Sequence, residues 1–478
     1  MFFLWLSQLR SRLVAVRNNN IEIQIVILLL LLLFILSIMN QYKTPLSSYV
    51  AGVSDMFPRS NRLRMVESGI EDRCEVDVLP FNAGINGSVT DNYAEFRWPA
   101  GQNCYIDLSR LVLEIKGNLK KGDGTSLGEA DHAVLCNSAM HSLIKSVSVY
   151  FNGQQVEQNP LYNFSSYVRL ETGMSPSLKK TLGRNMYYYD SSSIPRTYNK
   201  EIFTNASTQE KSAMSEVKTH GFHFMAPLLL DIASMDMYLL DNVSMRIRLE
   251  FASDKFVINA EPEASSSNPK VEIETCKLHL TTLKPRDSAR EALNKSLLRS
   301  PLSYIFNKTL YKTYVMASNQ TQLSIDMPWG STIPEKLALF MVDMKAYAGN
   351  YSENPLHFGH NHLSKLSVIV NNNSVYNIST SFPSRCSDLY YHSLNALGLE
   401  KEHSLDRDGF VNGKMVAVLD LQPEKLQDAI AIENSGSLRI AVELSQPHDS
   451  NIVLFLVGDT QGVMYVDSDR RVVTDIRA

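Results

Sequence analysis

The sequence predicts an all-β protein: two tandem jelly rolls, short helices in the loops and an N-terminal transmembrane helix. Three observations predict it. Most of the chain after residue 70 consists of short runs in which apolar and polar side chains alternate. Three distinct motifs occur twice, in the same order. One long apolar run precedes residue 40. The 478 residues are 44% hydrophobic and 20% charged, which is typical of a packed globular protein.

The N-terminal 45 residues form a separate unit. Residues 1–20 contain three arginines and no acid, and the apolar run Ile21–Met39 is close to the ~20 residues needed to cross a bilayer. A cleaved signal peptide is the alternative, but Ile38-Met39-Asn40-Gln41 offers no small residues for cleavage. We therefore expect a retained transmembrane helix at 21–39 and a linker at 40–70.

The charges that flank the apolar run bear on its orientation. The arginines before it favour a cytoplasmic N-terminus, as in a type II single-pass protein. Lys43, Arg59, Arg62 and Arg64 follow the run, so the charge difference across it is small. We expect the segment 1–20 to be cytoplasmic.

Alternation marks individual strands in the body. Leu111, Leu113 and Ile115 alternate with more polar neighbours, and Met245–Glu250 follows the same period of two. Val147–Phe151 also alternates and ends at Asn152-Gly153, a pair that accepts the positive φ angles of a tight hairpin. These patterns predict antiparallel, half-buried strands.

Helical spacing is less common. The clearest example is Pro285–Ser300, where Ala289, Ala292, Leu293 and Leu297 fall on one helical face. Shorter helices are predicted at Tyr162–Thr172, Cys386–Leu397 and Pro423–Ile432.

The internal repeat defines the domains. The paired motifs begin at Phe96 and Ile325, at Leu143 and Leu363, and at Ser244 and Ser437. The ordered set indicates duplication, and the decreasing offset places longer loops in the first copy. Each copy has the size of an eight-stranded jelly roll. We predict a first jelly roll at 71–284, a helical linker at 285–300 and a second jelly roll at 301–478.

Several stretches resemble a known family, the major capsid proteins of Polinton/Maverick elements and adintovirus-like viruses, in the adenovirus-hexon-like double jelly-roll lineage. The stretches are Tyr105–Leu111, Asp123–Leu127, His141–Val149, Tyr162–Thr172, Tyr238–Leu249, Ala346–Phe358 and Gly436–Leu444. The resemblance covers about residues 75–475. This chain departs from the family in two places. The resemblance does not account for the apolar run at 21–39, and the strand end near residue 280, which is usually basic in the family, reads Leu280-Thr-Thr-Leu-Lys here.

The resemblance implies a structural protein rather than an enzyme. Members of the family form trimers whose six jelly rolls look pseudo-hexagonal. The resemblance therefore implies that the partners are copies of the same chain, in a trimer and in the lattice of a virion or capsid-like assembly. The membrane would be reached through residues 21–39. The alternative is a capsid-derived host protein, tethered to a membrane, that binds a partner through loops near 175–220 and 400–412.

No catalytic residue, cofactor or small-molecule substrate is predicted. His357, His360 and His362 could bind a metal, since imidazole suits zinc and copper, but a loop or packing role is expected. A copper-dependent double-jelly-roll enzyme would need a second group of ligands, which the sequence lacks. The net charge of −4 and the absence of a basic tail argue against direct nucleic-acid binding.

Two further residue types are informative. Five cysteines without a C-x-x-C pair predict buried thiols or one chance disulfide rather than a zinc ribbon. If the body is lumenal, the candidate N-glycosylation sites are Asn86, Asn205, Asn307, Asn319 and Asn350.

Overall fold

The architecture comes from a computed structural model, which describes residues 69–84, 91–128, 131–189, 193–199, 208–235, 237–262, 267–399, 405–422 and 434–474. Both jelly rolls belong to one compact unit of the chain. The predicted transmembrane helix at 21–39 and most of the predicted linker lie outside the described residues. Among the helices of the described part, none is long and apolar enough to span a bilayer.

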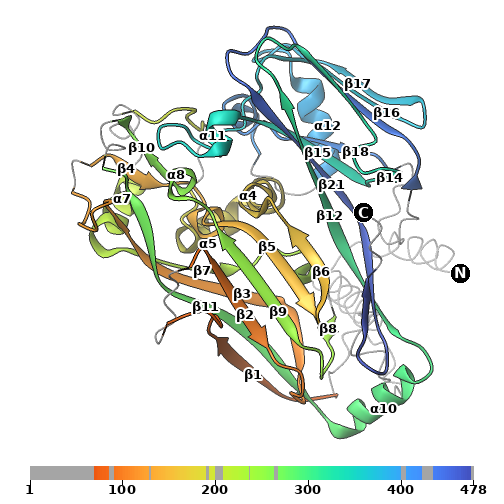
Figure 1. Cartoon of the computed structure of the whole chain (residues 1–478). Coiled ribbons are helices and arrows are strands. Elements are labelled where there is room, and N and C mark those ends of the chain that lie inside the picture. The colour runs from red at the N-terminus through yellow and green to blue at the C-terminus, as the bar shows by residue number, and fades with distance from the viewer. Residues whose placement is uncertain are drawn as a thin grey trace, which may run out of the picture. The chain divides into compact units, whose positions relative to one another are not determined.

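The first jelly roll consists of two antiparallel sheets of four main strands each (Figure 1). One sheet has the order β1 (Ile70–Val78), β11 (Lys270–Pro285), β3 (Tyr105–Lys120), β7 (Phe222–Pro227), and the other has the order β2 (Tyr93–Trp98), β9 (Met245–Phe251), β5 (Ile144–Phe151), β6 (Gln154–Asn159). Short β8 (Tyr238–Leu239) pairs with β3, and β4 (Ala133–Leu135) pairs with β10 (Ile258–Ala260).

The second jelly roll repeats this arrangement. Its sheets have the orders β12 (Leu302–Met316), β21 (Ile452–Val466), β15 (Lys336–Asp343), β18 (Ala417–Asp420) and β13 (Gln322–Asp326), β20 (Leu438–Leu444), β16 (Leu363–Val370), β17 (Asn373–Ser379). Short β22 (Val472–Thr474) pairs with β21, and β14 (Thr332–Ile333) pairs with β19 (Asn434–Ser435).

The three repeated sequence motifs occupy equivalent strands in the two copies. Phe96 and Ile325 lie on β2 and β13, the two hairpins are β5–β6 and β16–β17, and the last pair is β9 and β20. Each member of a pair holds the same place in its sheet. The predicted double jelly roll is therefore confirmed.

Helices occupy the connections between strands. They are α3 (Ala139–Ser142), α4 (Tyr162–Gly173), α5 (Pro176–Met186), α7 (Thr208–His220), α8 (Asp254–Val257), α10 (Asp287–Leu297), α11 (Met344–Ala348), α12 (Ser387–Leu397) and α13 (Arg407–Val411), with a 3₁₀ turn η2 (Ile232–Ser234). The helices predicted at 162–172, 285–300 and 386–397 are present as α4, α10 and α12. The one predicted at 423–432 lies outside the described residues.

Two predicted loops contain more structure than expected. The segment 175–220 contains α5 and α7, and 400–412 contains α13. Ser175 caps α5 by accepting a hydrogen bond from the Leu178 amide, and Pro176 follows at the first helical position. Both are sequence-readable signals of a helix start that the strand-based interpretation passed over.

The alternating patterns correspond to buried faces, as predicted. Val147, Val149 and Phe151 are fully buried, and the polar residues between them are not. At the end of this strand Asn152 and Gly153 have φ angles of 47° and 82°, which a type I′ hairpin turn requires. The turn and the burial pattern together set the register of the β5–β6 hairpin.

Candidate functional site

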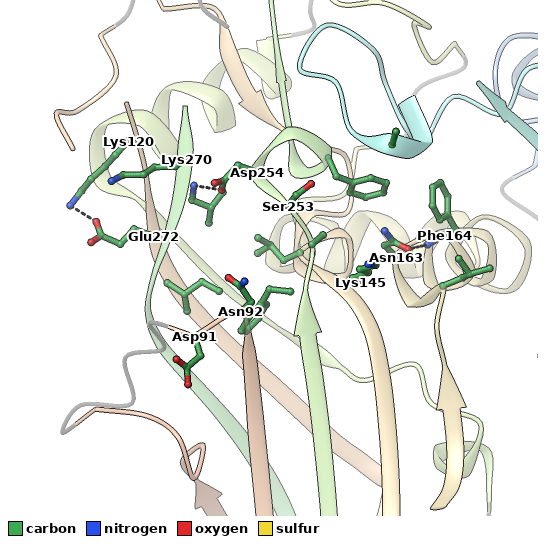
Figure 2. A pocket seen from close by; sticks show the side chains of 18 of the residues that line it. Asp91, Asn92, Lys120, Lys145, Asn163, Phe164, Ser253, Asp254, Lys270 and Glu272 are labelled. Carbon is green, nitrogen blue, oxygen red and sulfur yellow. Dashed lines mark hydrogen bonds and ion pairs between the residues drawn. The ribbon is translucent and has the colours of Figure 1, made fainter. Parts of the chain in front are cut away.

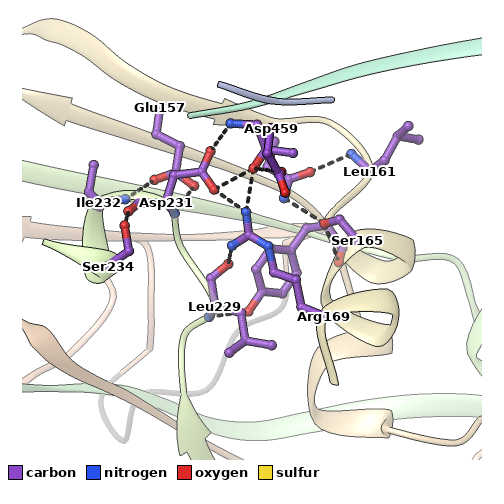
Figure 3. A network of polar contacts seen from close by, with 12 residues as sticks. Glu157, Leu161, Ser165, Arg169, Leu229, Asp231, Ile232, Ser234 and Asp459 are labelled. Atoms are coloured by element: carbon purple, nitrogen blue, oxygen red, sulfur yellow. Dashed lines mark hydrogen bonds and ion pairs between the residues drawn. The ribbon is translucent and has the colours of Figure 1, made fainter. Parts of the chain in front are cut away.

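A polar network joins the two jelly rolls around Arg169 of α4 (Figure 3). Its guanidinium donates to the Leu229 carbonyl at 3.0 Å, to the Thr309 hydroxyl at 2.8 Å and to the carboxylate of Asp231. Arg169 and Asp231 belong to the first jelly roll, whereas Thr309 lies on β12 of the second. One cation therefore stabilises a contact between segments that are distant in sequence.

Asp231 connects the network to the backbone of the second jelly roll. Its second carboxylate oxygen accepts the Thr309 amide at 2.8 Å, and its first accepts the Thr309 hydroxyl at 3.0 Å. Asp231 is 5% exposed, so these hydrogen bonds form away from solvent. A buried carboxylate with several donors is stabilising only while all of its partners remain in place.

Glu157 on β6 places a second carboxylate beside the first. Its oxygens accept the amides of Asp231 and Ile232 at 2.9 and 3.0 Å, and its residue is 6% exposed. Burial and the negative charge of Asp231 raise the pKa of Glu157 to about 8. The junction therefore holds three carboxylates near one arginine, since Asp459 on β21 also accepts the Thr309 hydroxyl at 3.4 Å.

A second buried cluster of charges joins the jelly rolls nearby. Glu171 of α4 accepts Lys179 at 2.8 Å and the Tyr188 hydroxyl at 2.7 Å, and Lys414 of the second jelly roll lies 3.4 Å away. Glu171, Lys179 and Lys414 are each at most 2% exposed. Tyr188 is buried as well, so the whole cluster is shielded from solvent.

Aromatic packing continues the junction in the apolar core. The ring of Phe164 on α4 lies 4.8 Å from Phe455 and 5.9 Å from Tyr347, both of the second jelly roll, and 5.4 Å from Phe256 of the first. The core of the first jelly roll is continuous with part of the second through these rings.

A different junction forms where residues 193–198, here called the strap, cross from the first jelly roll onto the second. The Ile194 amide donates to the Asn412 carbonyl at 2.9 Å, and the Tyr198 amide donates to the Ser352 carbonyl at 2.9 Å. The side chain of Arg196 pairs with Asp343 at 2.6 Å. The strap therefore binds at both of its ends and through a charged side chain.

His357 holds the same end of the strap as Asn412. Its Nδ1 donates to the Ile194 carbonyl at 2.7 Å, which places the proton of the neutral ring on Nδ1. The approach is close, since a Cβ on Gly413, whose φ is 104°, would lie 2.6 Å from Nδ1 and 2.7 Å from the Ile194 oxygen. Glycine is required here for conformation and for space.

Beside the strap lies a pocket of about 280 Å³ that gathers histidines. It is lined by His357, His360, His362 and His448 together with Arg196 and neighbouring residues. The sequence cluster at 357–362 is thus brought together, and His448 joins it from a distant loop. Sequence spacing could not have indicated His448, because about 85 residues separate it from the others.

The hydrogen bonds of these rings bear on metal binding. Nδ1 of His360 accepts the His362 amide at 3.1 Å, and Nδ1 of His448 accepts the Ser450 amide at 3.2 Å. The neutral His360 ring then carries its proton on Nε2, which leaves neither of its nitrogens with an available lone pair. Within the described residues, no group of three or more His, Cys, Asp or Glu side chains is arranged to hold a metal ion.

A larger open pocket of about 1550 Å³ lies at one end of the first jelly roll, where strand ends, α4 and α8 meet α11 of the second (Figure 2). Lys120 and Glu272 form an ion pair at 2.5 Å across its wall, and Asp254 accepts the Val271 amide at 2.8 Å. Burial raises the pKa of Asp254. Lysines and acids are mixed along the wall, so the pocket offers no surface of a single charge.

The predicted glycosylation sites fall in different settings. Asn307 on β12, Asn319 in the turn after β12 and Asn350 after α11 are exposed, whereas Asn86 and Asn205 lie outside the described residues. Glycosylation at these five positions stays a prediction. The five cysteines are all unpaired thiols, with Cys136, Cys276 and Cys386 buried, and the possible chance disulfide is absent.

Solved viral structures share this fold. A chain of the cryo-EM structure of the Sputnik virophage matches with a TM-score of 0.57 and 13% identity, over 91% of this chain and 94% of its own. The mavirus major capsid protein matches with a TM-score of 0.51 and 11% identity, over 91% and 96%. A chain of the PBCV-1 virus capsid gives 0.52 and 10%, over 87% and 99%.

At these identities the likeness establishes the fold, an all-β double jelly roll that extends over both halves of the chain. No family model matches the sequence, and no curated protein matches it.

Proposed function

We propose that the chain is a capsid-like structural protein that functions by associating with copies of itself. The observation that carries the proposal is the match of both jelly rolls, in order and over 87% to 91% of the chain, to chains of three viral structures. The resemblance to Polinton/Maverick capsid proteins supports the same role. Self-association requires no catalytic site, and we propose none.

The proposed assembly unit is a trimer. Two similar jelly rolls per chain give six similar units around a threefold axis, which is a shape that tiles a surface. The internal repeat supports this geometry because the two copies have the same strand order. Light scattering and electron microscopy of the full-length chain in detergent and of fragment 45–478 test it, and a stable monomer at micromolar concentration would contradict it.

We further propose that residues 21–39 anchor the subunit in a membrane with residues 1–20 on the cytoplasmic side. Support comes from the length and apolarity of this run. The test is carbonate extraction of membranes from cells that express the full-length chain. Leu30→Arg with Leu31→Arg should release the protein, since arginine at a helix centre is costly in a bilayer. The matched control is Gln8→Arg with Ser11→Arg, which should leave it membrane-bound.

The alternative function is that of a capsid-derived, membrane-tethered binding module that forms no shell. It predicts a monomeric body with a defined ligand. Both proposed functions are compatible with membrane anchoring. The oligomeric state distinguishes them, because the shell subunit should be a trimer and the binding module a monomer.

A further inference from the structure

We propose that the strap and the histidine pocket form an acid-sensitive clasp: neutral His357 holds the strap of the first jelly roll on the second, and protonation of the pocket releases it. The inference goes beyond the proposed function and does not depend on it, because every contact involved lies within one chain.

The closed clasp places His357 in one pocket with three other histidines and Arg196, so positive charge added there is repelled. His357 donates from Nδ1 to the Ile194 carbonyl, and its Nε2 lies 3.2 Å from the position that a Cβ on Gly359 would occupy. Protonation keeps the hydrogen bond to Ile194, because Nδ1–H still donates, but it adds a second N–H and a full positive charge to a partly buried ring beside Arg196. The Asn354 amide and side chain bind the strap alongside it, at the carbonyls of Arg196 and Pro195.

The charges around His357 come from every element that packs on it. His360, His362 and His448 line the pocket, and Arg196 enters it from the strap. Asp343 is paired with Arg196 and also accepts a hydrogen bond from the Ser450 hydroxyl at 2.5 Å. Glu353 forms an isolated antiparallel β-bridge with Thr197 of the strap.

The remaining charged groups lie behind the pocket. Lys414, next to Gly413, lies in the buried cluster with Glu171. Asp406 caps α13 by accepting a hydrogen bond from the Gly409 amide, and Asp408 lies in the first turn of that helix. Protonation of the four histidines would thus add positive charge beside the permanent charge of Arg196. The Asp343 carboxylate already binds Arg196 and Ser450.

The sign of the pH effect follows from the pKa values. Burial lowers the pKa of His357, against the opposing effect of its hydrogen bond to Ile194 and with a further lowering by Arg196. Burial, His362 and His357 lower the pKa of His360 to about 4. An open clasp would return these pKa values toward 6.5, so it binds protons more readily. The clasp is fully stable above about pH 6.5 and weakens as the pH falls toward 4.

Release of the clasp would be local. The strap lies between α5 and α7 of the first jelly roll, whereas the Arg169 network and the Phe164 cluster join the same two units elsewhere. Acid would therefore free the strap without separating the jelly rolls.

Hydrogen–deuterium exchange of the full-length chain tests the clasp. The readout is the protection factor of the Ile194, Tyr198 and Asn354 amides, corrected for the intrinsic pH dependence of exchange. We expect protection to fall at least tenfold from pH 7.5 to 4.5, while amides of the β16–β20 pairing stay protected. Constant protection of the strap over this range would overturn the proposal.

Variants separate charge from structure. In His357→Gln with His360→Gln, an amide can still donate to the Ile194 carbonyl but cannot become charged, so the pH dependence should flatten. The matched control is His279→Gln, a histidine that pairs with Asp77 and Glu114 away from the strap. An undiminished fall in the double variant would refute the clasp. If that variant leaves the strap open at every pH, Arg196→Gln replaces it; removal of the fixed charge should reduce the pH slope, and an unchanged slope would refute the clasp.

Discussion

The two junctions between the jelly rolls are built from different chemistry. At the first, Arg169, Asp231 and Glu157 form hydrogen bonds in a largely buried site, and Phe164 continues the contact in the core. At the second, the strap lies on the surface and binds through backbone amides, one half-exposed ion pair and one histidine. Burial makes the first junction part of global stability, whereas the second can open by itself.

The junctions also respond to pH in opposite directions. Glu157, with a raised pKa, favours its protonated form in the folded state, so its contribution is lost as pH rises through about 8. His357 and His360, with lowered pKa values, favour their neutral forms, so their contribution is lost as pH falls. The contribution of Glu157 is therefore largest below about pH 5, whereas that of the two histidines is fully present only above about pH 6.5.

The largest expected effect comes from removing the cation of the buried junction. Arg169→Met leaves the Asp231 carboxylate buried beside Glu157 without its ion pair, and we expect a loss of about 3 kcal/mol in the free energy of unfolding. Urea unfolding followed by circular dichroism measures it. Arg184→Met is the matched control, since Arg184 pairs with Glu216 on the surface and does not join the jelly rolls. An equal loss in both variants would contradict the comparison.

The next effect sharpens the pH contrast. The free energy of unfolding should decline as pH rises from about 5 to 8, because the unfolded state releases the Glu157 proton earlier than the folded state does. Glu157→Gln cannot titrate, so its profile over this range should be flatter than that of the wild type. Glu291→Gln, on the exposed face of α10, should keep the wild-type slope. If the free energy of unfolding of Glu157→Gln declined as steeply with pH as that of the wild type, groups other than Glu157 would cause the decline.

Much of the fold was predictable from sequence because jelly-roll strands are half-buried. Alternation at Val147–Phe151 and at Met245–Phe251 is imposed by one face packing on a core, and duplication repeats it. The helices α5 and α7 were missed because they lie in a long connection without a strand-like period. Ser175 and Pro176 at the start of α5 are local signals of a helix, and a search for strand periods does not detect them.

The junctions were much less predictable. Arg169, Asp231 and Thr309 are separated by 62 and 78 residues in the chain, and no periodicity connects them. The histidines at 357–362 were visible as a cluster, yet their role depends on Ile194 and Arg196 of the other jelly roll. Only the packing of two units brings these groups together, so a single-sequence pattern carries no signal for it.

A smaller effect tests a single hydrogen bond between β12 of the second jelly roll and β8 of the first. Tyr304 on β12 is fully buried and donates to the Tyr238 carbonyl at 3.0 Å. Tyr304→Phe should lower the free energy of unfolding by about 1 kcal/mol, the usual value for one neutral hydrogen bond. Tyr391→Phe, on the exposed face of α12, is the control and should change nothing measurable. No change at Tyr304 would mean that this hydrogen bond adds no stability to the contact between the jelly rolls.

The smallest effect on global stability is expected at the strap. Arg196 is 48% exposed in its ion pair with Asp343, and such pairs contribute well under about 1 kcal/mol because solvent screens them. Arg196→Ala should therefore leave the urea midpoint nearly unchanged. The same variant should lower hydrogen-exchange protection of Ile194 and Tyr198, because local opening is governed by the few contacts of the strap itself. The control Arg184→Ala should leave the hydrogen-exchange protection of Ile194 and Tyr198 unchanged. If Arg196→Ala lowered the midpoint as much as Arg169→Met, the strap would belong to the same cooperative unit as the buried junction, and the distinction between the two would fail.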